Sequence, residues 1–148
     1  MREQKSTQTI TAPAPAPKAG IPANRAKQSA LAAAAAAIDK KAERVKILDL
    51  GTLSGFTDFF VLCSGASNRQ VHAIASSVET RLRESGRRAI AIEGLNEGRW
   101  VLLDFGDVVV HVFLDAIRDY YDLDSLWADA PRVPVPAEFY GPAASPQE

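Results

Sequence analysis

The distribution of proline constrains this chain more than any other feature of its sequence. All nine prolines lie outside residues 23–130, in two groups near the ends of the chain. Proline interrupts helices and central strands, because it lacks a backbone N–H and its ring restricts φ. Residues 1–28, rich in proline and alanine, and residues 131–148 are therefore predicted to be extended, mostly disordered tails. Residues 29–130 remain as the one folded domain.

Charge divides along the same boundaries. Residues 1–28 carry a net charge of +4, residues 29–130 of −4 and residues 131–148 of −1, which accounts for the −1 of the whole chain. A mildly acidic domain suits a basic protein partner better than a phosphate backbone, so direct binding of nucleic acid is not expected. The apolar run 30–38 is mostly alanine and is too short for a membrane span.

Cysteine and histidine are scarce. Cys63 is the only cysteine, and His72 and His111 are the only histidines. These counts argue against an internal disulfide, a zinc site built on cysteines and a His-rich metal centre, so no cofactor is expected. A single thiol also fits a reducing compartment such as the cytoplasm.

Hydrophobic periodicity predicts the elements of the domain. The run 58–64 is almost continuously apolar, which is typical of a strand buried on both faces. The full order is α-β-β-α-β-β-β-α, a mixed β-sheet flanked by helices, in an α/β or α+β sandwich. The expected elements are a helix over 29–42, strands over 45–50 and 58–64, a helix between Ser67 and Gly86, a strand over 89–93, two strands within 100–114, a helix with Asp115 as its N-cap, and a short turn or helix over 122–127.

The second helix has a clear start signal. Ser67 and Gln70 have the spacing of a capping box, with Ser67 as N-cap and Gln70 at the third helical position. The same helix start, with Arg69 beside it, is also the kind of place where anions bind. A P-loop is excluded because no Gly-Lys-Ser/Thr follows. A tight turn with a capping box is the favoured interpretation, and an anion site at Ser67 and Arg69 is the alternative.

The two strands within 100–114 predict a functional face. A two-residue turn at 105–106 pairs Asp104 with Asp107, and side chains then alternate between two faces. One face is wholly apolar and is expected to pack on the core: Val101, Leu103, Val108, Val110, Val112 and Leu114. The other has the mixed composition of a protein-binding face: Trp100, Leu102, Asp104, Asp107, Val109 and His111. The alternative is that a helix covers this second face and that His111 hydrogen-bonds Asp104 or Asp107.

Evidence for catalysis is weak. Asp104, Asp107 and His111 cluster in the predicted hairpin, where they would bind a metal or act as acid and base. A nucleophile, Ser64 or Cys63, would need a base nearby, and a cysteine in an apolar run is usually an inert core thiol. A metal-dependent nucleotidyl- or phosphoryl-transfer enzyme therefore stays an alternative. So does a homodimeric scaffold that uses its Trp100 face for self-association. Tyr120, Tyr121 and Trp127 lie at helical spacing, for which core packing or a dimer contact is expected.

Several ordered blocks of sequence together resemble one known family, the ribosomal silencing factors, also called Iojap-like proteins. The resemblance covers residues 29–130. The blocks are Asp58 to Val61, Ser64 to Val71, Glu93 with Gly94, Trp100 to Phe113, and Tyr121 to Trp127.

The resemblance implies a nucleotidyltransferase-like fold without an established transferase activity. It further implies binding to the large ribosomal subunit through its ribosomal protein numbered fourteen (uL-fourteen), where the small subunit docks, so that subunit joining and translation are repressed under nutrient limitation. Family members also form homodimers, and the tryptophan matching Trp100 lies in the region tied to the ribosomal contact. On this basis Trp100 and Leu102 are expected to supply apolar anchors, and Glu93, Asp104 and Asp107 complementary charge.

Two departures from related patterns matter. The signature of active nucleotidyltransferases, Gly-Ser followed by Asp-x-Asp, is missing, because Gly65 is followed by Ala66 rather than serine and neither Asp104 nor Asp107 begins an Asp-x-Asp. This argues against nucleotide transfer. The long proline-rich ends have no family role to inherit.

Overall fold

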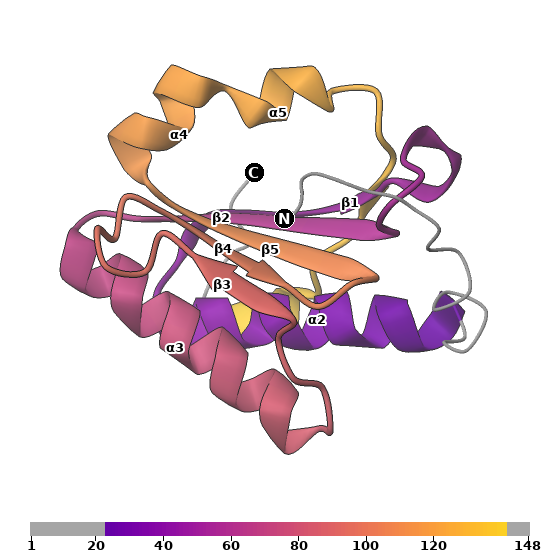
Figure 1. Ribbon diagram of the computed structural model, residues 1–148, viewed down its shortest axis with the longest axis horizontal. Coiled ribbons are helices and arrows are strands. Elements are labelled where there is room, and N and C mark those ends of the chain that lie inside the picture. The colour runs from indigo at the N-terminus through magenta and orange to yellow at the C-terminus, as the bar shows by residue number, and fades with distance from the viewer. Residues whose placement is uncertain (1–22, 142–148) are drawn as a thin grey trace.

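A six-stranded mixed sheet forms the middle of three layers in the computed structural model, which describes residues 23–141 (Figure 1). The strand order is β3-β4-β5-β2-β1-β6, and every neighbouring pair is antiparallel except β2 with β5. This confirms the predicted fold class and adds one strand to it. The strands are β1 (Glu43–Asp49), β2 (Phe59–Gly65), β3 (Ala91–Glu93), β4 (Trp100–Asp104), β5 (Val108–Leu114) and β6 (Arg132–Val133).

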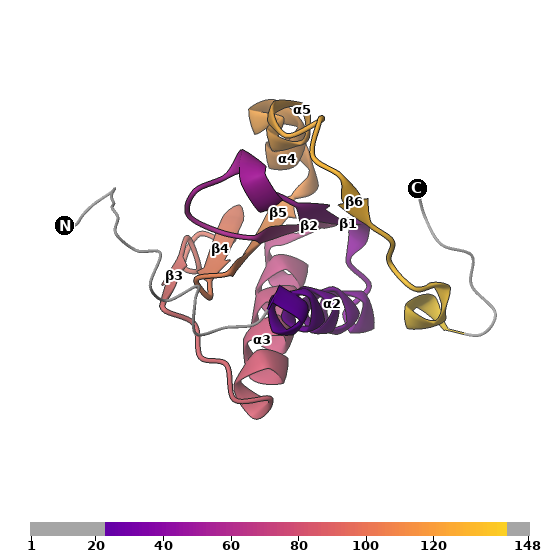
Figure 2. The same ribbon diagram turned by 90° about the vertical axis from the view of Figure 1, so that its right-hand side faces the viewer.

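Helices cover both faces of the sheet. The two long helices, α2 (Ala23–Asp39) and α3 (Asn68–Glu84), lie side by side on one face. The two short helices, α4 (Asp115–Tyr121) and α5 (Leu123–Leu126), lie on the other, as both views show (Figures 1 and 2). Two 3₁₀ turns, η1 (Gly51–Leu53) and η2 (Ala137–Tyr140), complete the described chain. No helix within residues 23–141 has the length and apolar character needed to cross a membrane.

Strand β2 is buried along its whole length, as its continuous apolar sequence predicts. Val61 and Cys63 face the α2–α3 layer, whereas Phe60 and Leu62 face the α4–α5 layer. Burial raises the pKa of the Cys63 thiol to about 12, so the thiol stays protonated at neutral pH. Cys63 is therefore the inert core thiol that its sequence context indicates.

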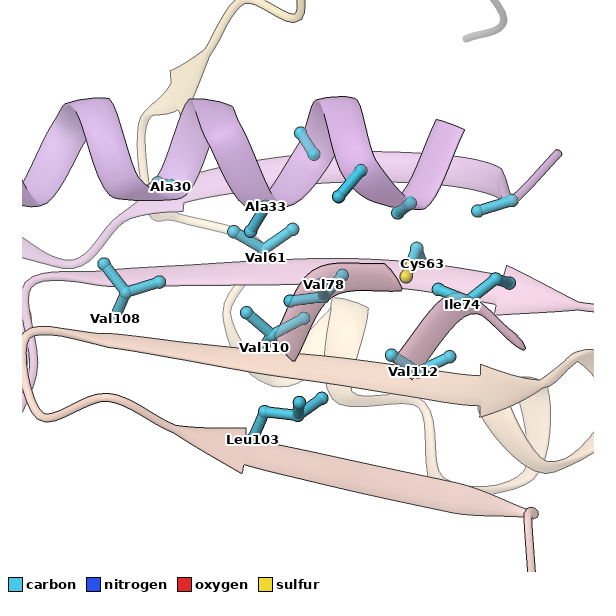
Figure 3. Packing of buried hydrophobic residues seen from close by; sticks show 14 of the residues in the cluster. Ala30, Ala33, Val61, Cys63, Ile74, Val78, Leu103, Val108, Val110 and Val112 are labelled. Atoms are coloured by element: carbon cyan, nitrogen blue, oxygen red, sulfur yellow. The ribbon is translucent and has the colours of Figure 1, made fainter. Parts of the chain in front are cut away.

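Alanines on α2 set the distance between that helix and the sheet. Ala33 is fully buried and lies directly against Val61 of β2 (Figure 3). The remaining space is filled by branched side chains from α3 and the sheet, among them Ile74, Val78 and Val110. The fully buried alanines of α2 are Ala26, Ala30, Ala33, Ala34, Ala36 and Ala37.

The folded region is longer at both ends than predicted. Helix α2 begins at Ala23, six residues before the expected start at 29, because no proline interrupts the helix after residue 22. Residues 131–141 are not a tail: β6 pairs with β1, and Val135 and Phe139 pack on the core. Prolines flank β6 because it is an edge strand, where a missing N–H is tolerated. The rest of the predicted tails, 1–22 and 142–148, lies outside the described residues.

One helix start also differs. Asp115 was expected to be the N-cap of α4, but Leu114 takes that position without a side-chain cap and Asp115 is the first helical residue. The Asp115 carboxylate instead contacts the exposed Arg44 guanidinium at 3.4 Å. A carboxylate in the first turn is still favourable for the helix dipole.

Candidate functional site

The β4–β5 hairpin differs from its predicted register by two residues. Trp100 pairs with Phe113, Leu102 with His111 and Asp104 with Val109. The turn lies at residues 106–107 rather than 105–106, because the Phe105 N–H bonds the Val108 carbonyl and Gly106 adopts a φ of 92°. The Asp104 carboxylate supports this turn by accepting from the Gly106 N–H at 2.8 Å.

The two predicted faces survive this shift, since a slip of two residues preserves the alternation of side chains. Val101, Leu103 and Val110 lie in the core beneath the sheet, on the side of α2 and α3. Trp100 and Leu102 lie on the opposite side and pack on the second core cluster. The prediction of two faces is therefore confirmed for the strand residues.

Asp107 does not belong to the predicted binding face. It lies in the turn, where strand alternation no longer applies, and its side chain is 2% exposed. It forms an ion pair with Arg87, which follows α3. Arg87 also donates to the Ser29 hydroxyl at 2.7 Å and to the Phe105 carbonyl at 3.2 Å. Asp107 thus joins the turn to α2 and to the end of α3, and cannot meet a partner directly.

His111 is also enclosed. Only 4% of the residue is exposed, and its Nδ1 accepts a hydrogen bond from the Trp100 indole at 3.1 Å. The bond to Asp104 or Asp107 that belonged to the alternative interpretation does not form, because Asp104 supports the turn and Asp107 pairs with Arg87. Burial lowers the pKa of His111 to about 3, so the imidazole is neutral at physiological pH.

The alternative interpretation, in which a helix covers the face that carries Trp100, is correct for part of that face only. Ile117 from α4, Leu123 from α5 and Trp127 after it pack on the second core cluster. The Trp127 ring meets Phe60 edge-on, with ring centroids 5.6 Å apart. The part of the face near β3 and the start of β4 stays accessible.

A buried arginine fixes the two covering helices. The Arg118 side chain is completely buried and binds both carboxylate oxygens of Asp124, at 3.0 and 2.8 Å. Its remaining contacts are the Arg44 carbonyl at 2.7 Å and the Ser64 hydroxyl at 2.9 Å. Hydrogen bonds from Arg118, and a further one from Lys46, hold the pKa of Asp124 well below its usual range. The candidate nucleophile Ser64 is therefore a buried structural hydroxyl.

The accessible part of the face forms a cleft of about 390 Å³, here called the Trp100 cleft. The Trp100 ring contacts both Phe113 and Tyr121, with centroid distances of 4.9 and 5.0 Å. Gly94 has a φ of 81°, and a side chain there would overlap the Trp100 carbonyl oxygen, so glycine lets the β3–β4 loop approach β4. The lining residues are Glu93, Gly94, Glu97, Arg99, Trp100, Leu102, Ile117 and Tyr121.

Sequence reasoning missed Glu97, Arg99, Ile117 and Tyr121 as members of this cleft. Glu97 and Arg99 come from the β3–β4 loop, whereas Ile117 and Tyr121 come from α4, and only the packing of α4 across the sheet brings these two beside Trp100. The one available signal was the helical spacing of Tyr121, which indicated a contact surface but did not identify the residues that it contacts. Glu93, Trp100 and Leu102 were predicted and do line the cleft.

The alternative anion site has no further support. The Ser67 hydroxyl accepts from the Gln70 N–H at 3.1 Å, which confirms the predicted N-cap. The side-chain oxygen of Gln70, Oε1, accepts from the Ala66 N–H at 2.7 Å. In a standard capping box the donor would be the N–H of the N-cap, one residue later. The side-chain amide of Gln70 also reaches the carbonyls of Lys40 and Lys41. Capping thus accounts for Ser67, while Arg69 is an exposed side chain of the first turn.

The predicted acid–base or metal cluster does not form. Asp104, Asp107 and His111 have three different partners and do not converge. Within residues 23–141, no group of three or more His, Cys, Asp or Glu side chains is arranged to hold a metal ion. The arrangement that a metal-dependent transferase would need at these three residues is therefore absent.

Comparison with known proteins identifies the family. The sequence model described as "Ribosomal silencing factor during starvation" matches residues 23–148. The chain is 48% identical over 99 residues to a ribosomal silencing factor of Bacillus subtilis, covering 67% of this chain and 84% of that protein. It is 35% identical over 75 residues to the mouse protein "Mitochondrial assembly of ribosomal large subunit protein 1", covering 49% of this chain and 33% of that protein.

A solved structure agrees with these sequence matches. A crystal structure of a protein from Chromobacterium violaceum superimposes with a TM-score of 0.68 at 42% sequence identity, and covers 69% of this chain and 85% of that one. The fold, the family match over 23–148 and the level of identity lead to one conclusion: this chain belongs to the ribosomal silencing factor family.

Proposed function

We propose that this protein binds the large ribosomal subunit through uL-fourteen and thereby blocks joining of the small subunit, repressing translation when nutrients are limiting. Family membership supports an association with the ribosome and a role in regulating translation. The name of the mouse relative refers to the large ribosomal subunit. The proposal places the protein in the cytoplasm, with the ribosomes it would act on.

The Trp100 cleft is the observation that carries this proposal. It combines exposed aromatic and aliphatic surface with two acidic side chains, Glu93 and Glu97. Carboxylates attract lysine and arginine, and the faces of Trp100 and Tyr121 favour cations as well. Arg99 lies on the same rim and would meet an acidic group or a carbonyl of the partner. A basic protein surface fits this chemistry better than RNA does, because Glu93 and Glu97 would repel phosphates.

The proposed contact is narrower than the face predicted from sequence. Glu93, Trp100 and Leu102 are accessible in the cleft, whereas Asp107 and His111 are buried. Asp104 lies at the far end of β4, half-buried, and burial raises the pKa of its carboxyl. The apolar anchors and the Glu93 charge are therefore proposed as the direct contacts.

Steric exclusion needs no catalysis. Two bodies cannot occupy the same surface, so inhibition follows the occupancy of the large subunit by this protein. At a free concentration about 100-fold above Kd, subunit joining would be disfavoured by about 2.7 kcal/mol through mass action.

Sucrose-gradient sedimentation tests the proposal directly. The purified protein is mixed with separated large subunits, with small subunits and then with both. We expect it to travel with the large subunit only and to reduce the amount of whole ribosomes. A direct binding assay with purified uL-fourteen then tests the partner. Protein that stays at the top of every gradient, with normal ribosome formation, would contradict the proposal.

Replacing the central aromatic residue tests the surface. Trp100→Ala should weaken binding to the large subunit by about 2 kcal/mol, or roughly 30-fold, as expected for an interface hot spot. Phe56→Ala is the matched control, because Phe56 is an aromatic residue 64% exposed on the β1–β2 loop, outside the cleft. It should bind like the wild type.

The same pair of variants separates binding from self-association. Velocity sedimentation of each free protein reports whether Trp100→Ala changes the oligomeric state. Two results would remove Trp100 from the proposed ribosomal contact. One is that Trp100→Ala binds the large subunit as well as the wild type, and the other is that its weaker binding is explained by dissociation of a homodimer.

A further inference from the structure

We propose that His111 is a positioning residue: through Nδ1 it holds the indole N–H of Trp100 and so orients the ring that meets the partner in the Trp100 cleft. His111 does not reach the partner itself, since it is enclosed beneath Trp100. The inference rests on the proposed function for its biological meaning, although the Trp100–His111 contact can be tested in the free protein.

The geometry allows only one form of the imidazole. An indole nitrogen always donates, so Nδ1 of His111 must be the unprotonated acceptor and the ring proton must lie on Nε2. Within the described residues, Nε2 is buried without a hydrogen-bond partner. The imidazole lies among aromatic rings, the nearest being Phe60, whose ring meets it edge-on with the centroids 4.5 Å apart. A protonated imidazole has no acceptor and would release Trp100; burial disfavours that form.

The indole of Trp100 has two ways to satisfy its N–H. In the observed one it donates inward to His111, while the ring makes tilted contacts with Phe113 and Tyr121 at the edge of the cleft. Without an acceptor at His111, the N–H is either left unpaired inside the protein or turned outward to water. Leaving it unpaired is the more costly of these, so the ring would reorient. The acceptor at His111 therefore keeps the exposed part of the indole apolar.

Two isosteric variants separate this role from simple packing. His111→Asn keeps an acceptor oxygen at the position of Nδ1, whereas His111→Leu has almost the same shape as asparagine and no acceptor. Both leave the same gap, and leucine is the better buried side chain. We expect His111→Leu to weaken large-subunit binding roughly 5-fold, the effect of one neutral hydrogen bond, and His111→Asn to stay within about 2-fold of the wild type.

Thermal unfolding of both variants provides the control for folding. If His111 only fills space, affinity follows stability and His111→Leu binds at least as well as His111→Asn, which would overturn the proposal. A greater loss of binding by His111→Leu, despite equal or higher stability, would support it. In a Trp100→Ala background, His111→Leu should cause no further loss of binding, because its effect acts through Trp100.

A readout on the free protein keeps the positioning role distinguishable from the proposed function. In ¹H–¹⁵N NMR spectra, with the two indole signals assigned by Trp127→Phe, the Trp100 N–H should exchange with solvent faster in His111→Leu than in His111→Asn. Equal exchange rates would refute the positioning role and leave the ribosomal proposal standing. If the exchange rates of the two His111 variants differ but Trp100→Ala still binds the large subunit like the wild type, the ribosomal contact is refuted and the positioning role stands.

Discussion

At the scale of single residues, a buried imidazole makes folding depend on pH. His111 has a pKa of about 3 in the folded protein, against 6.5 for the exposed side chain, because burial disfavours its charged form. Below pH 6.5 the unfolded chain therefore takes up a proton that the folded chain excludes until about pH 3. The contribution of His111 to the free energy of unfolding is fully present above pH 6.5 and is lost as the pH falls from 6.5 toward 3.

We expect the free energy of unfolding to fall with decreasing pH, and we expect this pH dependence to be weaker in His111→Leu than in the wild type. Between pH 6.5 and pH 4, this one group should lower the stability by up to about 1.4 kcal/mol per pH unit. Urea unfolding of the wild type and His111→Leu at pH 7, 6, 5 and 4 measures the difference. Carboxylates such as Asp124 titrate in both proteins, so they do not affect the comparison. Parallel pH profiles would show that His111 is not the source.

At the scale of elements, the placement of α4 and α5 depends on one buried ion pair. Arg118 is completely buried, and Asp124 neutralises its charge from the start of the next helix. The chain reverses between them at Asp122, which has a φ of 53°. Because α4 supplies Ile117 and Tyr121 to the Trp100 cleft, this ion pair also positions one wall of the cleft.

Two aspartates on these helices test this argument. Asp124→Ala should destabilise the protein by about 3 kcal/mol, since it leaves a buried guanidinium without its carboxylate. Asp119→Ala is the matched control: Asp119 pairs with Arg44 in a largely exposed ion pair, and its loss should change the stability by less than about 1 kcal/mol. Chemical denaturation of the two variants gives both values. Similar losses would mean that Arg118 is solvated or paired in another way.

At the scale of the whole molecule, alanine determines how closely the helical layer approaches the sheet. Ala33 has no exposed surface and lies against Val61, whereas Ala35 on the same helix is only partly buried. A larger side chain at Ala33 has no space and would push α2 away from β2. Such overpacking usually costs 1–3 kcal/mol.

Leucine at these two positions tests the layer spacing. Ala33→Leu is expected to lower the free energy of unfolding by about 2 kcal/mol, while Ala35→Leu should change it by less than about 0.5 kcal/mol. Helix propensity is nearly the same for alanine and leucine, so the difference reports packing. Thermal or urea unfolding measures it. A tolerated Ala33→Leu would indicate that α2 can shift without loss.

The sequence alone was sufficient for features that depend on neighbouring residues. The continuous apolar run of β2 predicted burial on both faces, and alternation in β4 and β5 predicted which side chains share a face, even though the hairpin register was two residues off. Ser67 was identified as an N-cap for the same reason, since capping acts over three residues. The family could also be predicted, because its motifs are contiguous blocks.

Tertiary structure alone decided which distant groups meet. Asp107 pairs with Arg87 instead of joining the binding face, and Arg118 reaches Ser64, 54 residues away in the chain. The indole of Trp100 donates to His111 although the two residues are not directly paired in the hairpin, and Tyr121 reaches Trp100 only because α4 folds back over the sheet. Local propensity and periodicity determine each element and its apolar face, whereas polar side chains take partners from whichever segments packing brings within hydrogen-bonding distance.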